Sequence, residues 1–231
     1  MTQKAVCLLS GGLDSATALY VAKSLGYDVM ALTIYYGQLH DKEILSAKEI
    51  ARELEIEHRI ISISLPWGGS ALLDPEIPVP TGRNESEMSD GIPSTYVPAR
   101  NSIFLTLAAS YAEAVEAQAI FIGANALDYS GYPDCRPEYF KAVEAVLRLG
   151  TKAGLEGKGA RIETPLLKLS KKEIIELGMG LGVHFEKTWS CYQGQELPCG
   201  ECDSCLLRAK GFREAGVQDP LLTYAASSHG K

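Results

Sequence analysis

The sequence predicts an α/β protein with a doubly wound parallel sheet, on two observations. Apolar runs typical of buried strands alternate with stretches of helical periodicity over most of the chain, a pattern typical of parallel strands joined by right-handed crossovers. The first apolar run, residues 5–9, also ends in two glycines directly before a helical stretch. We therefore expect a ligand site at the carboxyl edge of the sheet.

The expected elements follow one another in a regular order. Strands are expected at residues 4–9, 28–36, 59–63 and 119–122, with a short extended piece at 162–167. Helices are expected at residues 16–25, 41–54, 103–114, 139–149 and 170–179. The last of these begins with a capping box of Ser170 and Glu173. In the helix from residue 41, apolar residues recur at helical spacing, which places Lys42 and Glu43 on its outer face.

Two regions depart from this alternation. Residues 65–98 are rich in proline and glycine, and we interpret them as a lid, with a mobile linker as the alternative. After residue 183 the strand pattern ends and cysteines gather. We therefore divide the chain into an α/β domain at residues 1–184 and a small cysteine-containing segment at residues 185–231.

Composition narrows the classes of protein. The 231 residues are 46% hydrophobic and 22% charged, enough for one full-sized core and a small appendage. The net charge of −7 disfavours a nucleic-acid partner and favours a small-molecule substrate. No apolar run is long enough to span a membrane, and the chain starts directly with a strand pattern rather than a signal peptide. We therefore expect a cytoplasmic protein without membrane contact.

The loop after the first strand has the chemistry of a phosphate site. Backbone N–H groups at an uncapped helix start, together with serine hydroxyls, suit a phosphate chain. The sequence differs from the common P-loop, because no lysine follows the glycines. The alternative is a glycine turn in which Asp14 and Ser15 are ordinary N-cap residues. The residues assigned to nucleotide binding are Leu9, Ser10, Gly11, Gly12, Leu13, Asp14 and Ser15.

Four of the six cysteines form a cluster near the end of the chain: Cys191, Cys199, Cys202 and Cys205. Four thiolates at this spacing are typical of a closed structural zinc site. An iron–sulfur cluster is the rival, although the fourth cysteine lies upstream and no proline follows Cys205. Of the two remaining thiols, Cys7 is expected in the core, and Cys135 is expected to be buried beside the site.

Several motifs in one order carry a resemblance to a known family. The loop SGGLDS at residues 10–15 resembles the pyrophosphate loop of N-type ATP pyrophosphatases. Together with YGQ at 36–38, DGIPSTYVPARN at 90–101, SGYPDCR at 130–136, ETPL at 163–166 and the cysteine cluster, it resembles the 7-cyano-7-deazaguanine synthase family. The resemblance extends over almost the whole chain, except for residues 67–87.

The resemblance implies an ATP-dependent ligase of queuosine biosynthesis. Such an enzyme converts 7-carboxy-7-deazaguanine and ammonia to 7-cyano-7-deazaguanine through an adenylated carboxylate and then an adenylated amide. The resemblance also implies Mg²⁺ at the nucleotide, one structural Zn²⁺ and a homodimer. Two alternatives stay open: a tRNA-thiolating relative, whose cysteines would carry sulfur, and a non-catalytic nucleotide-binding or zinc-ribbon adaptor.

The resemblance also suggests roles for individual residues. Ser10, Asp14, Ser15 and Arg100 are the expected catalytic residues, with Asp14 positioning Mg²⁺. The alternative role for Arg100 is a surface salt bridge. For Tyr96 and Tyr132 the alternative is a packing role. Lysines 168, 171 and 172 could approach phosphate, but we interpret this lysine run at a helix start as a solvated face. The histidines are assigned nothing. The expected substrate-binding residues are Tyr96, Arg100, Asn101, Tyr132, Asp134 and Arg136.

Overall fold

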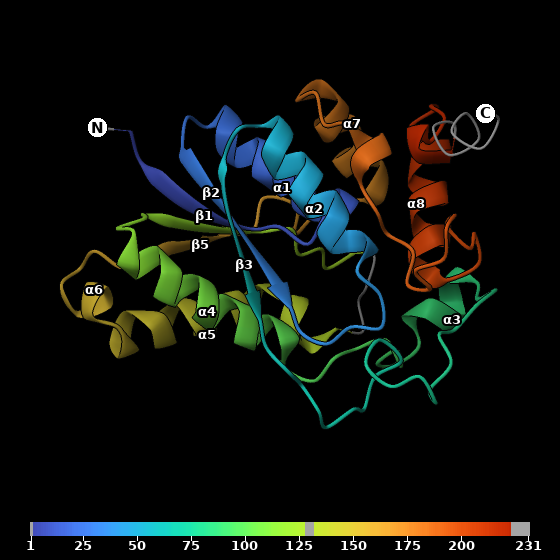
Figure 1. Cartoon of the computed structure of the whole chain (residues 1–231), viewed down its shortest axis with the longest axis horizontal. Coiled ribbons are helices and arrows are strands. Elements are labelled where there is room, and N and C mark those ends of the chain that lie inside the picture. The colour runs from blue at the N-terminus through green and yellow to red at the C-terminus, as the bar shows by residue number, and fades with distance from the viewer. Residues whose placement is uncertain (1, 128–131, 223–231) are drawn as a thin grey trace.

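The computed structural model describes residues 2–127 and 132–222 and confirms the predicted fold class. Five parallel strands form a single sheet in the order β3-β2-β1-β4-β5 (Figure 1). In register, Ala5 of β1 pairs with Val29 of β2 on one side and with Ala119 of β4 on the other. The strands are β1 (Lys4–Leu8), β2 (Asp28–Tyr35), β3 (Glu57–Ser62), β4 (Ala119–Ile122) and β5 (Arg161–Glu163).

This strand order creates a crevice at the carboxyl edge of the sheet. The chain moves outward from β1 to β3 and then returns to β4 on the other side of β1. The connections on the two sides therefore leave the carboxyl ends of β1 and β4 in opposite directions, which opens a space between them. The Ser-Gly-Gly loop lies at this switch point.

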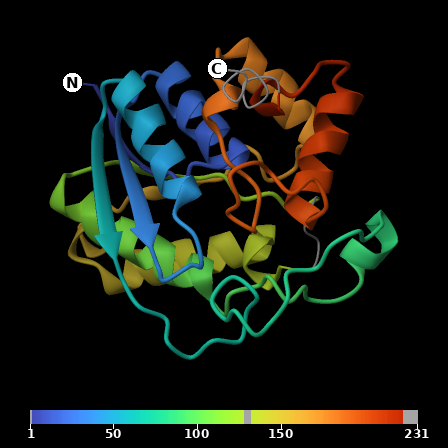
Figure 2. The same ribbon diagram turned by 45° about the vertical axis from the view of Figure 1, so that its right-hand side comes forward.

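Helices cover both faces of the sheet (Figures 1 and 2). One face packs against α1 (Leu13–Ser24), α2 (Lys42–Glu53) and α7 (Lys171–Gly180), and the other against α4 (Arg100–Ala114) and α5 (Pro137–Gly150). Each face has its own apolar core, in which the largest fully buried side chains include Phe121 and Leu105. The short helical elements are α3 (Glu85–Ser89), η1 (Pro133–Cys135), α6 (Lys152–Leu155) and η2 (Phe185–Lys187).

The end of the chain contains a helix that the sequence analysis missed, α8 (Asp203–Glu214). It packs against α7, and its Phe212 meets Phe185 edge-on with ring centroids 5.6 Å apart. Phe212 joins the same core as α1. The division of the chain at residue 184 stays a prediction.

The segment 65–98, interpreted as a lid, is attached to the structure along its length. Leu65, Leu72 and Val97 are buried in the core beside α4. Its middle docks on the cysteine segment, where Thr81 forms a β-bridge with Cys202 and the Gly82 N–H donates to the Glu201 carbonyl at 2.9 Å. Arg83 also forms an ion pair with Asp203. The cysteine segment therefore holds the middle of this long connection in place.

Across the described ranges 2–127 and 132–222, none of the helices has the length and apolar character needed to cross a membrane.

Candidate active site and metal centre

The Ser-Gly-Gly loop ends in a helix start without a side-chain cap. Helix α1 begins at Leu13, earlier than the expected residue 16, and its N-cap is Gly12, so neither Asp14 nor Ser15 serves as the N-cap. The Ser15 hydroxyl donates to the Gly12 carbonyl at 3.0 Å and lies 2.9 Å from the Ser10 hydroxyl. These contacts hold the loop in shape, while the uncapped first turn leaves N–H groups for an anion.

Two glycines allow neighbouring backbone to pack directly on this loop. Gly11 has φ +91°, and a Cβ there would lie 1.9 Å from the Glu43 carbonyl oxygen of α2. Gly123 follows β4, and a Cβ there would lie 2.7 Å from the Ser15 nitrogen. A side chain at either position would displace the loop. The loop is therefore clamped between the start of α2 and the end of β4.

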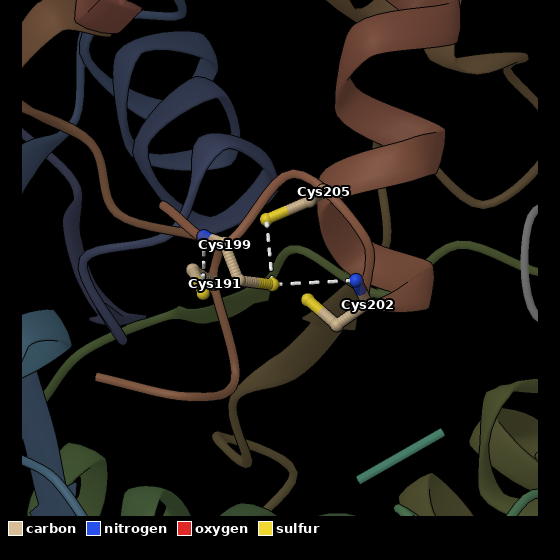
Figure 3. Close-up of side chains that lie close together, drawn as sticks. All are labelled: Cys191, Cys199, Cys202 and Cys205. Carbon is tan, nitrogen blue, oxygen red and sulfur yellow. Dashed lines mark hydrogen bonds between the residues drawn. The ribbon is translucent and has the colours of Figure 1, made fainter. Parts of the chain in front are cut away.

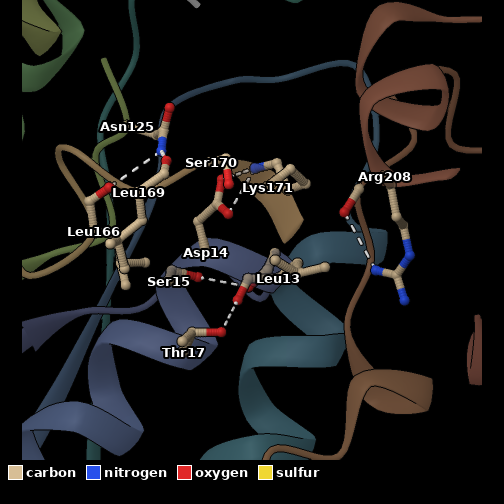
Figure 4. Close-up of polar contacts among 12 residues, drawn as sticks. Leu13, Asp14, Ser15, Thr17, Asn125, Leu166, Leu169, Ser170, Lys171 and Arg208 are labelled. Carbon is tan, nitrogen blue, oxygen red and sulfur yellow. Dashed lines mark hydrogen bonds and ion pairs between the residues drawn. The ribbon is translucent and has the colours of Figure 1, made fainter. Parts of the chain in front are cut away.

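An ion pair lies at the mouth of the loop (Figure 4). The Lys171 ammonium donates to both carboxylate oxygens of Asp14, at 2.7 and 2.9 Å. The interpretation of the lysine run as a solvated face is wrong for Lys171, whose side chain is 9% exposed, whereas that of Lys172 is 45% exposed. The capping box places Ser170 at the N-cap of α7, so Lys171 is the first residue of the helix, and its side chain points to Asp14 (Figure 4). The structure thus supplies the cation that the loop sequence lacks.

Gly211 of α8 makes room for Lys171, and replacing it tests this arrangement. A Cβ at Gly211 would lie 2.4 Å from Lys171 Cγ and 2.8 Å from Ile175 Cδ1. We expect Gly211→Ala to lower kcat/KM about 10²-fold, because a shift of about 1 Å in a positioning group has an effect of this size. The measurement is the steady-state rate of the adenylation reaction that the family resemblance implies. Gly180→Ala is the control, since nothing lies within 4 Å of a Cβ there, and an unchanged rate in Gly211→Ala would contradict the expectation.

Arg100 and Tyr132 line the same cavity as the loop, and so does Asn101. The Arg100 guanidinium lies 5.8 Å from the Tyr36 ring centroid and donates to the Tyr36 hydroxyl at 3.3 Å. Within the described part of the chain it makes no ion pair, which argues against the surface salt bridge. Helix α4 begins at Arg100, and the preceding residue, Ala99, has φ +54°.

Three of the predicted substrate-binding residues do not line the cavity: Tyr96, Asp134 and Arg136. Asp134 is buried, and its carboxylate accepts from the Asn101 N–H at 3.1 Å, at the start of α4. Arg136 is exposed and donates to the Pro133 carbonyl at 3.1 Å. The Tyr96 hydroxyl accepts from the Ala99 N–H. Tyr96 and Asp134 thus hold the backbone at the start of α4. Of the loop SGYPDCR, residues 130 and 131 lie outside the described residues.

The cavity also contains residues that the sequence analysis did not assign. Glu43, placed on the outer face of its helix, lines the cavity because the first turn of α2 overhangs the carboxyl edge of the sheet. Burial raises the pKa of Glu43 to about 7, against the opposing effect of Arg100. His40 and Arg208 also line it, and Arg208 forms an ion pair with Asp219 at 2.6 Å. Nothing in their local sequence patterns signals this placement.

The four clustered cysteines come together as one group (Figure 3). Their sulfur atoms all lie within 4.8 Å of one another, and those of Cys199 and Cys205 are 3.9 Å apart. The backbone N–H groups of Cys199 and Cys202 donate to the sulfurs of Cys191 and Cys199, both at 3.3 Å. Such bonds favour thiolates, and four thiolates at these separations fit a tetrahedral ion. The cysteines therefore form a candidate metal site.

Comparison with known proteins agrees with this geometry. The sequence model of the family "Queuosine biosynthesis protein QueC" matches residues 4–216. The chain belongs to the QueC family. It is 57% identical over 221 residues to a 7-cyano-7-deazaguanine synthase of Trichodesmium erythraeum, covering 95% of this chain and 100% of that one. It is 56% identical over 219 residues to one of Thermoplasma acidophilum, covering 95% and 91%.

The fold of this QueC-family chain also resembles a solved structure of another kind. The NMN synthetase of Francisella tularensis aligns with a TM-score of 0.51 and 21% sequence identity, covering 94% of this chain and 79% of that one. At this identity the likeness concerns the fold alone.

Proposed function

We propose that this QueC-family enzyme is an ATP-dependent ligase that converts 7-carboxy-7-deazaguanine and ammonia to 7-cyano-7-deazaguanine. The observation that carries the proposal is the uncapped loop with the Asp14–Lys171 pair at its mouth, facing the same cavity as Arg100. Identity of 57% to a named synthase over its full length supports the substrate and product.

The loop provides for a pyrophosphate leaving group. The N–H groups of the first turn of α1 and the ammonium of Lys171 are donors for phosphate oxygens, and they stabilise the negative charge that develops as pyrophosphate departs. Asp14 offers the carboxylate oxygens that Mg²⁺ prefers, so it would hold this ion together with the phosphates and help neutralise them.

The departure of pyrophosphate allows the carboxylate of the substrate to be activated. The carboxylate oxygen of the substrate attacks the α-phosphorus, pyrophosphate leaves, and an acyl adenylate forms. Arg100 suits orientation of that carboxylate, because its planar fork matches two oxygens. Ammonia then attacks the carbonyl carbon, AMP leaves, and the loss of a proton gives the amide. In a second round the amide oxygen attacks the α-phosphorus of a second ATP and pyrophosphate leaves. Departure of AMP with its oxygen, and loss of the two N–H protons, then leaves the nitrile.

The cysteine site supports folding rather than the reaction. Cys191, Cys199, Cys202 and Cys205 would hold Zn²⁺ with all four positions occupied, so no position is left for water or substrate. A closed group of four thiols also argues against the tRNA-thiolating alternative, in which cysteines carry sulfur. We further propose that the enzyme is cytoplasmic and has no nucleic-acid partner. The net charge of −7 supports the second of these statements. The homodimer is proposed from the family resemblance alone.

Product analysis tests the proposed function. Purified enzyme with ATP, Mg²⁺ and ammonium is expected to release AMP and pyrophosphate only when 7-carboxy-7-deazaguanine is added, with two AMP formed per nitrile. Mass spectrometry distinguishes the nitrile from the amide by one water. Release of ADP and phosphate instead would overturn the proposed cleavage between the α- and β-phosphates.

A further inference from the structure

Glu43 has a fixed position in the wall of the cavity. It lies in the first turn of α2, and the absence of a side chain at Gly11 lets the Glu43 carbonyl approach the pyrophosphate loop directly. The helix start is therefore locked against the loop, which fixes the backbone of Glu43 at the wall of the cavity. A fixed backbone limits where the carboxylate can lie, and recognition benefits from such a limit.

The carboxylate of Glu43 has no donor of its own. Among residues 2–127 and 132–222, none donates a hydrogen bond to it and none forms an ion pair with it. Burial raises its pKa to about 7, which is the expected effect of removing an anion from water without replacing its hydrogen bonds. Glu43 is half-buried and its oxygens still reach solvent, so a ligand that displaces this water has to supply donors in its place.

Arg100 complements Glu43 across the same cavity. The two are near enough for the charge of Arg100 to lower the pKa of Glu43, yet they do not form an ion pair. The cavity wall therefore presents the hydrogen-bond donors of the Arg100 guanidinium and, separately, the two acceptor oxygens of the Glu43 carboxylate. The pyrimidine edge of a deazaguanine carries an acceptor oxygen followed by two adjacent donors, N1–H and the 2-amino group. Asp134, the carboxylate among the expected substrate-binding residues, already accepts from the backbone of α4.

We propose that Glu43 determines specificity by accepting hydrogen bonds from the N1–H and the 2-amino group of the deazaguanine ring. The inference rests on the proposed function, because it assumes this ring as the substrate. A carboxylate accepts two parallel donors in a fork, so an analogue without the 2-amino group leaves one oxygen unsatisfied. A site built this way rejects such analogues strongly.

The experiment compares two enzymes with two substrates. Wild type and Glu43→Gln are each assayed with 7-carboxy-7-deazaguanine and with the analogue that lacks the 2-amino group. Each single change is expected to lower kcat/KM about 100-fold, the range for a hydrogen bond to a charged group. The two changes together are expected to add no more than about fivefold beyond either one, because they remove the same contact. The loss is expected in KM, with kcat within about threefold, as for binding made equally before and during reaction.

Glu49→Gln is the matched control, because it is the same substitution on the outer face of the same helix, where Glu49 pairs with Lys187 at 3.5 Å. It is expected to retain wild-type kcat/KM for both substrates. Additive losses, or equal use of both substrates by wild type, would overturn the proposal. A fall in kcat with KM unchanged would also overturn it and assign Glu43 to proton transfer instead. If wild type fails to form the nitrile, the proposed function itself has failed.

Discussion

Lys171→Met is expected to lower kcat about 10³-fold, the scale found when a donor that stabilises developing charge is removed. Lys171 brings the buried ammonium to the loop, where it lies 2.7 Å from Asp14. Methionine keeps the length and apolar stem of the side chain and removes the charge. The measurement is the rate of pyrophosphate release at saturating 7-carboxy-7-deazaguanine. Lys172→Met, one residue further along α7 with a side chain 45% exposed, is expected to change the rate less than twofold.

Stability measurements separate catalysis from folding in this prediction. Lys171→Met leaves the partly buried Asp14 carboxylate without its partner. An unpaired charge of this kind lowers the stability of the folded protein. The double variant Asp14→Asn, Lys171→Met is expected to regain part of the lost stability in urea, while its rate stays as low as that of the single variant. Recovery of activity together with stability would show that the pair serves folding only.

Removal of the metal from the cysteine site is expected to lower the Tm by roughly 10 °C or more. Loss of a structural metal belongs to the few changes that cost over about 4 kcal/mol, and about 1 kcal/mol corresponds to 2–4 °C in a chain of this size. Thr81 and Gly82 pair with Cys202 and Glu201. Chelation is therefore expected to remove hydrogen-exchange protection from both the cysteine segment and residues 81–83, with the Tm read by calorimetry.

Cysteine variants identify the metal. Cys199→Ser is expected to abolish zinc binding, whereas Cys7→Ala is expected to keep about one zinc per chain, because Cys7 belongs to β1 and its side chain lies in an apolar core. A visible absorbance band that bleaches on reduction would instead indicate an iron–sulfur cluster.

Much of the fold and part of the site could be predicted because their signals are local. The alternation of strands and helices predicts the parallel sheet, and the Ser10–Ser15 loop is a continuous stretch whose chemistry depends on its own backbone. The cysteine spacing likewise brings thiols together through one tight knuckle. Boundaries were less well predicted: α1 starts at Leu13 rather than residue 16, and α8 (Asp203–Glu214) was missed because cysteines dominated the interpretation of its first turn.

The rest of the site depends on contacts between distant parts of the chain. Lys171 and Asp14 are 157 positions apart, and only the packing of α7 against α1 and α8 turns this lysine away from solvent. The spacing of Glu43 predicts the outer, solvent-facing side of its helix. However, the start of this helix projects past the sheet, so Glu43 lines the cavity instead. Asp134 shows the reverse, because a polar residue in a loop at the right edge is used to hold α4.

The sequence by itself determined the fold class, the phosphate loop and the group of four cysteines, since each is encoded by the spacing of neighbouring residues. Only the tertiary structure decided that Lys171 and Glu43 line the cavity and that Asp134 and Arg136 do not. The physical reason is that the burial of a charged side chain depends on the elements that pack against it. These elements come from distant parts of the chain, as α8 does where Gly211 packs against Lys171.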